Sequence, residues 1–181
     1  ELGWEIFITP DFAEHVFETL LQAGKAYDIR LIGGEALNAL RIEKGFLHWG
    51  HDMAYTEAPH QVGLDFACRP NKEIAFIGRN AYLDRRTEAK GPFIASVRLC
   101  EPEPLLYNNE PVILDGKVVG FVTSGAYSAI SGRAIGLCML DLPFQALVGD
   151  ANFSVMVEGV PVPAVVSRRA FYDPDNCRML E

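Results

Sequence analysis

The sequence predicts an α+β protein: a small α/β sandwich-like domain, residues 1–90, followed by a Greek-key β-barrel domain, residues 91–181. Two observations predict this. The first half combines helix-period apolar spacing with short strand-like runs. The second half consists of short β-rich runs about ten residues apart, separated by turn signals, which is typical of small barrels. A chain of 181 residues with 49% hydrophobic residues can form two such cores.

The chain opens with an alternating, β-rich run, and we expect residues 3–9 to form a strand. Thr9 suits a helix N-cap with Pro10 at the first helical position, so a helix should run to residue 23 and end at Gly24. Its predicted buried face consists of Phe12, Val16, Phe17 and Leu20. Residues 29–32 form a short apolar link to the next element.

A second helix is predicted over residues 35–44, ending at Gly45 in the C′ position. At about 100° per residue, one apolar arc comprises Ala36, Leu37, Ala39, Leu40 and Ile42, with Asn38 and Arg41 opposite it. Glu43 falls within that arc, where desolvation and the negative end of the helix dipole both oppose its charge. Such a carboxylate needs a buried cation, hydrogen-bond donors or a ligand that supplies donors. A Glu paired with a nearby Arg or Lys, or turned outward at a frayed helix end, is an equally good interpretation.

The remainder of the first half contains an aromatic and histidine-rich stretch after Gly45 and a polar loop to Pro59. Residues 62–68 are predicted as a strand and residues 80–86 as a short helix. The domain boundary is expected at residues 89–92, where mixed helical and strand-like patterns give way to regularly spaced, short β-rich runs.

Six strands are predicted in the second half: residues 93–99, 111–114, 117–123, 134–140, 154–157 and 162–166. Turn signals are Asp115-Gly116, Ser124-Gly125 and Glu158-Gly159, and Asp-Gly between strands is a strong hairpin signal.

Composition narrows the function classes. A formal net charge of −8 argues against nucleic-acid or anionic-membrane binding, and we find neither a signal-peptide pattern nor an apolar run near the ~18 residues of a membrane span. The four scattered cysteines favour free thiols in a reducing compartment, either bacterial cytoplasm or mitochondrial matrix. The chain begins at Glu1-Leu2 without Met and is expected to be part of something longer.

Two further groups resemble reactive sites. His48, His51 and Asp52 lack the spacing of an HExxH or facial-triad metal site, and aromatic packing with hydrogen-bonding histidines is the better interpretation. The run TSGAYS, residues 123–128, lacks the GxSxG pattern and an evident base, so its Ser124, Tyr127 and Ser128 are interpreted as turn residues of the barrel.

Taken in order, the segments ELGWEIF, LNALRIEKGFLHWGHDM, TEAPHQVGLDFACR, FIGR, GKVVGFVTSGAYS and FYDP resemble the glycine-cleavage T-protein (aminomethyltransferase) family over nearly the whole chain. The likeness is greatest to the T-protein-like part of dimethylglycine and sarcosine dehydrogenases. It implies a tetrahydrofolate-binding protein whose first domain, with the catalytic Asp, is not in this chain. FAD would belong to an upstream domain, and no catalytic residue or metal is assigned here.

The resemblance also implies a set of folate-binding residues. The family's pterin-binding Glu falls on Glu43, and its basic residue falls on Lys72 or, because CRPNK replaces the usual VKLDK pattern, on Arg69. The C-terminal folate-contacting Tyr falls on Tyr172, and Trp49 of the WG.D signature is a further candidate. A carboxylate can accept both N–H groups of the pterin edge, a strong charge-assisted pairing.

Three functions are compatible with this resemblance. The first is the folate-binding segment of an enzyme that transfers a one-carbon unit from a methylated amine of the glycine, sarcosine or dimethylglycine class, inactive as an isolated chain. The second is a non-catalytic folate-binding or regulatory module, and the third is a folate-dependent S- or O-demethylase. Its partners would be folate, a small amine and the missing N-terminal portion of the same protein.

Overall fold

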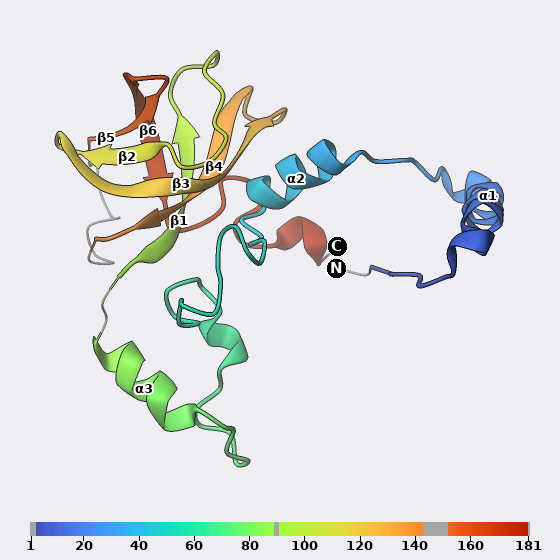
Figure 1. Ribbon diagram of the computed structural model, residues 1–181, viewed down its shortest axis with the longest axis horizontal. Helices are drawn as coiled ribbons and strands as arrows, with labels where there is room; N and C mark the ends of the chain where they lie inside the picture. The colour runs from blue at the N-terminus through green and yellow to red at the C-terminus, as the bar shows by residue number, and fades with distance from the viewer. Residues whose placement is uncertain (1–2, 89–90, 143–151, 181) are drawn as a thin grey trace.

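The computed structural model describes residues 3–88, 91–142 and 152–180 (Figure 1). The helices are α1 (Ala13–Gly24), α2 (Gly34–Glu43) and α3 (Arg79–Glu88), and the strands are β1 (Phe93–Leu99), β2 (Pro111–Leu114), β3 (Lys117–Ser128), β4 (Arg133–Leu140), β5 (Phe153–Val157) and β6 (Val160–Ser167). Short 3-10 turns lie at Pro10–Phe12, Lys25–Tyr27, Asp65–Ala67 and Cys177–Met179. The α+β class is confirmed. The predicted boundary at 89–92 falls partly on residues 89 and 90, which lie outside the described residues.

The six strands close into a barrel in the order β1-β4-β3-β2-β5-β6, with every neighbouring pair antiparallel. Strand β1 lies beside β4, while β2, β3 and β4 are consecutive neighbours, which is a Greek-key arrangement. The barrel prediction is confirmed. Five predicted strands agree with the observed bounds to within two residues at each end, and only β3 extends well beyond its prediction.

The interior of the barrel is filled by apolar side chains from all six strands. Val97, Leu99, Val112, Val122, Leu140 and Val155 are fully buried there. Burying one such side chain contributes about 1.5–3 kcal/mol. The second half of the chain therefore has a hydrophobic core of its own.

The turns of the barrel follow their sequence signals at two of the three predicted places. Asp115-Gly116 and Glu158-Gly159 have positive φ at both residues, as a type I′ hairpin requires. The turn predicted at Ser124-Gly125 is wrong, because both residues lie within β3 and pair with β4. Gly125 is needed for close approach instead: a Cβ there would lie 2.2 Å from the Leu106 carbonyl oxygen.

Helix α2 ends at the barrel in the way the sequence predicts. Gly45 has φ +69°, its N–H bonds to the Ile42 carbonyl at 3.0 Å, and the Phe46 N–H bonds to the Arg41 carbonyl at 2.8 Å. These two bonds form a Schellman motif. Ile42, 2% exposed, packs against Ile135 and Leu137 of β4.

The predicted apolar arc of α2 is largely wrong as a buried face. Leu37 and Leu40 are 59% and 49% exposed, whereas Asn38 and Arg41 are half-buried. The cause is the polar contacts that Arg41 makes with the barrel. Periodicity shows only which residues share a face, and these contacts turn the side of α2 that carries Asn38 and Arg41 toward the barrel, together with Ile42 and Glu43 at the helix end.

The first half of the chain differs most from prediction. Residues 3–9 have no strand structure, because no described strand pairs with them and a strand requires a hydrogen-bonded neighbour. Residues 62–68 form turns and a 3-10 helix, with Gly63 at φ +72°, so the predicted strand is wrong there as well. The predicted helix over residues 80–86 is confirmed by α3.

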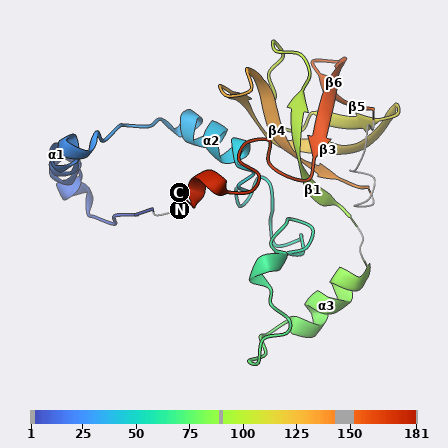
Figure 2. The same cartoon turned by 180° about the vertical axis from the view of Figure 1, so that it is seen from behind.

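Helix α1 forms close to its predicted place, but its apolar face is exposed. Phe12, Phe17 and Leu20 are 60%, 49% and 44% exposed, so the prediction of a buried face is wrong for the described structure. Figures 1 and 2 show α1 at the far end of the molecule from the barrel. The cap is also different, because Thr9 is extended but makes no capping side-chain hydrogen bond. Among the described residues, no helix combines the length and apolar character needed to cross a bilayer.

Candidate functional site

Glu43, the last residue of α2, lies buried against the barrel and is 6% exposed. The Ser128 hydroxyl, at the end of β3, donates a hydrogen bond of 2.5 Å to Glu43 Oε1. The backbone N–H of Ser131 donates to that hydroxyl at 3.0 Å and so fixes its direction. Of the alternatives that the sequence left open, Glu43 lies inward and is not turned out at a frayed helix end, and its hydrogen-bond partner is a serine hydroxyl of the barrel.

A cavity of about 200 Å³ adjoins this carboxylate. Apolar and aromatic walls come from Ile42, Ile130, Ile135, Phe171 and Tyr172, and polar groups come from Glu43, Arg98, Ser128 and Ser131. A largely apolar cavity with a few polar groups is the usual form of a small-molecule site. The buried carboxylate suits a ligand that presents N–H donors.

A second buried polar cluster fixes α2 on the barrel. Asp52, with a fully buried side chain, accepts hydrogen bonds from the Arg41 guanidinium, from the His48 backbone N–H at 2.8 Å and from Thr123 Oγ1 at 2.5 Å. Arg41 also donates to Ser124 Oγ at 2.7 Å. Because Arg41 lies two residues before Glu43, this cluster sets the position of the helix end that carries the carboxylate.

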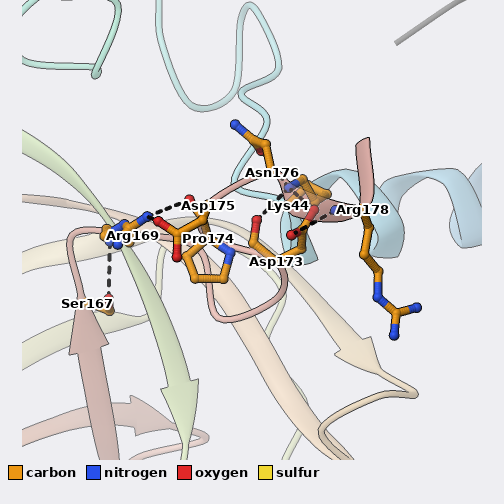
Figure 3. Close-up of polar contacts among 8 residues, drawn as sticks. All are labelled: Lys44, Ser167, Arg169, Asp173, Pro174, Asp175, Asn176 and Arg178. Atoms are coloured by element: carbon orange, nitrogen blue, oxygen red, sulfur yellow. Dashed lines mark hydrogen bonds and ion pairs between the residues drawn. The ribbon is translucent and has the colours of Figure 1, made fainter. Parts of the chain in front are cut away.

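Residues 168–178, which follow β6, form the C-terminal segment, and Figure 3 shows how Lys44 holds it. Lys44 Nζ donates to the Asp173 carbonyl oxygen at 2.8 Å, to Asp173 Oδ2 at 3.1 Å and to Asn176 Oδ1 at 2.7 Å. Desolvation opposes the charge of Asp173, but Lys44 and backbone N–H groups outweigh it and lower the pKa of this carboxyl. Within the segment, Arg169 donates to Asp175 and to the Pro174 carbonyl.

Two aromatic rings of this segment face the cavity. Phe171 and Tyr172 both line it. Residue spacing alone indicates neither of them, and Tyr172 is a candidate only through the family resemblance. The Arg98 guanidinium lies 4.7 Å from the Phe171 ring centroid, and that of Arg178 lies 6.0 Å from the Tyr172 centroid. Such cation–π contacts help to orient the two rings.

Of the sequence-predicted residues, the structure brings together Glu43 and Tyr172 at the cavity. Lys72 and Arg69 lie on the exposed loop after Cys68, outside the cavity, and Lys72 Nζ is 5.1 Å from the Phe76 ring centroid. Trp49 is 62% exposed and also lies outside it. The folate roles predicted for these residues stay predictions.

Sequence reasoning missed part of the site. The interpretation of Ser124, Tyr127 and Ser128 as turn residues is wrong, because all three lie in β3 and two of them bond to α2. The His48 and His51 rings stack at 4.7 Å, while Asp52 pairs with Arg41. In the described part of the chain, no group of three or more His, Cys, Asp or Glu residues could hold a metal ion. Arg98 and Lys44 carried no sequence signal, since their partners are distant in the chain.

Comparison with protein families supports the sequence resemblance. Residues 1–72 match the model described as the GCVT N-terminal domain. Residues 94–173 match the glycine cleavage T-protein C-terminal barrel domain. The second match covers the observed barrel and most of the C-terminal segment.

Curated relatives include enzymes of two kinds. The chain is 39% identical over 179 residues to a 4-methylaminobutanoate oxidase (formaldehyde-forming) of Paenarthrobacter nicotinovorans and 27% identical over 179 residues to the mitochondrial dimethylglycine dehydrogenase of Mus musculus. It is 31% identical over 172 residues to an aminomethyltransferase of Clostridium botulinum. These matches cover 99%, 99% and 95% of this chain, but only 21%, 21% and 46% of the relatives, so the chain spans less than half the length of each.

The fold has a solved counterpart. The structure matches the crystal structure of the glycine cleavage system aminomethyltransferase T from Bartonella henselae with a TM-score of 0.76 and 20% identity. The match covers 91% of this chain and 45% of that one. The two family models, the relatives and the fold agree, and the chain belongs to the glycine-cleavage T-protein (aminomethyltransferase) family.

Proposed function

We propose that this chain is the tetrahydrofolate-binding segment of an enzyme that passes a one-carbon unit from a methylated amine to tetrahydrofolate. The names of its relatives support this proposal: one is an aminomethyltransferase, and two are an oxidase and a dehydrogenase of N-methylated amines. Removing an N-methyl carbon by oxidation produces a reactive one-carbon unit, and tetrahydrofolate is the acceptor that the resemblance implies. The one observation that carries the proposal is the buried Glu43 carboxylate beside a cavity.

The chemistry of Glu43 fits the pterin ring. Two adjacent N–H donors of the pterin edge would be accepted by one carboxylate, and charge-assisted pairs of this kind are about twice as strong as neutral ones. The Ser128 hydroxyl holds one oxygen of Glu43 in place, so the acceptor is oriented before a ligand arrives. Preorganisation of this kind lowers the entropic cost of binding.

The size and walls of the cavity also fit a single ring system. At about 200 Å³ it is smaller than the ~300–1,000 Å³ that is common for drug-sized ligands, so it can enclose a flat heterocycle but not a whole folate. Phe171 and Tyr172 provide aromatic surface against which such a ring can stack. The rest of the ligand would extend outside the cavity, and the resemblance implies Lys72 or Arg69 as its basic partner.

The catalytic step would need other parts of a longer protein. Exclusion of water and close approach of the one-carbon donor to the folate would supply most of the rate. The exposed apolar residues Phe12, in the 3-10 turn before α1, and Phe17 and Leu20, in α1, offer a surface for an N-terminal portion that completes the enzyme. An FAD-dependent oxidation would take place elsewhere in such a protein.

The test is calorimetric titration of the purified chain with tetrahydrofolate, comparing the wild type with Glu43→Gln. Glutamine keeps the size but loses the charge and one acceptor, so binding should weaken by about 1–3 kcal/mol. Glu35→Gln, on an exposed residue in the first turn of the same helix, is the matched control and should bind like the wild type. Equal affinity of Glu43→Gln and wild type would refute the assignment. Transferase turnover by the isolated chain would show that the catalytic group lies within it.

A further inference from the structure

Lys44 connects two parts of the chain that both line the Glu43 cavity, the end of α2 and the C-terminal segment. It directly follows Glu43, and its Nζ bonds to Asp173 and Asn176, which are 129 and 132 residues away. Asp173 directly follows Tyr172. One side chain therefore joins the helix end that carries the carboxylate to the segment that carries the aromatic wall (Figure 3).

The contact between Lys44 and the C-terminal segment has the features of a specific tertiary interaction. An ammonium group has three N–H donors, and three acceptors lie within 2.7–3.1 Å of Lys44 Nζ. The side chains of Lys44 and Asp173 are only 11% and 7% exposed, so water screens the pair little. A surface ion pair is worth little, whereas breaking a buried one leaves a charge without its partner.

The backbone of the C-terminal segment is shaped to present these acceptors. Asp173 and Asn176 both have positive φ, +42° and +57°, and the Asn176 N–H closes the turn on the Asp173 carbonyl at 3.0 Å. That carbonyl is the same one that accepts from Lys44. The position of Lys44 at the end of α2, where the helix dipole favours a cation, adds to the attraction.

We propose that Lys44 is a positioning residue for the cavity: it holds the C-terminal segment against the end of α2, so that Phe171 and Tyr172 close the space beside Glu43. The ligand part of this inference rests on the proposed folate function. The contact of Lys44 with the C-terminal segment does not depend on that function, and it can be measured in the absence of any ligand.

The ligand-free test compares Lys44→Met with the wild-type chain by hydrogen-exchange mass spectrometry and by nitration of tyrosine. Exchange in peptides spanning residues 168–178 should accelerate about tenfold or more, as expected when charged hydrogen bonds are lost. Nitration of Tyr172 should rise, whereas that of Tyr55, already 88% exposed, should stay the same. Lys44→Arg should restore most of the protection. Lys117→Met, on an exposed residue of the β2–β3 hairpin, is the control and should change neither readout.

The ligand-bound test is a double-mutant cycle on the tetrahydrofolate dissociation constant. Lys44→Met alone should raise the constant about tenfold, and Tyr172→Ala alone should raise it as well. If Lys44 acts through Tyr172, adding Lys44→Met to Tyr172→Ala should change the constant less than threefold. Additive effects would show that Lys44 only supports general stability and would overturn its positioning role.

Different results would refute the positioning role of Lys44 and the proposed folate function. Unchanged exchange in residues 168–178 and unchanged nitration of Tyr172 in Lys44→Met would overturn the positioning role, whatever the chain binds. Equal tetrahydrofolate affinity of wild type and Glu43→Gln would refute the proposed function, and the ligand-free readouts would still decide the role of Lys44.

Discussion

Replacing Asp52 by alanine should detach α2 from the barrel. The Asp52 side chain is fully buried and accepts hydrogen bonds from Arg41, from the His48 backbone N–H and from Thr123. Alanine removes all of these acceptors at once. The guanidinium of Arg41, only 16% exposed, then lacks its counter-charge, and Thr123 Oγ1 retains a longer contact of 3.2 Å to the Leu137 carbonyl.

The magnitude follows from the burial of the pair. Removing one partner of a buried ion pair typically costs about 3–5 kcal/mol, because the other charge stays desolvated and unpaired. Arg41 keeps its bonds to Ser124 and Asn38, so we expect a value near the lower end, about 3 kcal/mol. The barrel core does not include Asp52, and the loss should fall on α2 and not on the barrel.

Hydrogen exchange resolves this local effect. Peptides covering residues 34–46 should exchange about a hundredfold faster in Asp52→Ala, since ~1.4 kcal/mol corresponds to a factor of ten, while peptides from β1 and β4 keep their wild-type rates. The double variant Arg41→Met/Asp52→Leu should lose less than the sum of the single variants, because it removes both charges together.

An exposed ion pair gives the matched control. Arg30 and Asp28 bond to each other with side chains that are 78% and 79% exposed, so Asp28→Ala should change protection by no more than about 0.5 kcal/mol. The reasoning is refuted if Asp52→Ala leaves residues 34–46 as protected as Asp28→Ala does.

Three other predictions concern packing and pH. Ile42→Ala should destabilise the docking of α2 by about 2–5 kcal/mol, measured by the same exchange assay, because a 2%-exposed side chain is removed from the contact with β4. Burial and a hydrogen bond to Asp65 raise the pKa of Tyr82 to about 12. The protonated Tyr82 phenol therefore contributes fully to the stability of the fold below pH 10, and this contribution is lost as the pH rises through 12. In an absorbance titration, Tyr82→Phe should lack the phenol that titrates last in the wild type. Gly125→Ala should destabilise the barrel in urea by about 1–3 kcal/mol or more, since the new Cβ would meet the Leu106 carbonyl at 2.2 Å.

The barrel could be predicted because its signals are local. Short β-rich runs identify the strands, and Asp115-Gly116 and Glu158-Gly159 can adopt the positive φ values that a tight hairpin needs. Strand β3 shows the limit of this reasoning. Ser124-Gly125 has the composition of a turn, but its glycine serves a close backbone approach that depends on a segment about 20 residues earlier.

The first half could be predicted less well because its elements depend on partners. Residues 3–9 alternate like a strand, yet a strand forms only beside another one. The apolar face of α1 likewise indicates that another part of the protein should cover it, but the sequence pattern does not show which part. In α2, the contact of Arg41 with Asp52 and Ser124 decides which face meets the barrel, and no periodicity reveals such a contact.

The residues of the candidate site also differ in how far the sequence alone identifies them. Glu43 was identifiable because a carboxylate in an apolar arc has an evident energetic cost. Its partner Ser128 lies 85 residues away, and the acceptors of Lys44 lie still further along the chain. Only the folded structure shows that Glu43, Ser128 and Tyr172 border one cavity.

The most direct test of the central claim is a crystal structure of the chain with tetrahydrofolate. We expect the pterin ring between Ile42 and Tyr172, with its two adjacent N–H donors within hydrogen-bond distance of the Glu43 oxygens. A pterin bound elsewhere, with the Glu43 carboxylate still bonded only to Ser128, would contradict the account.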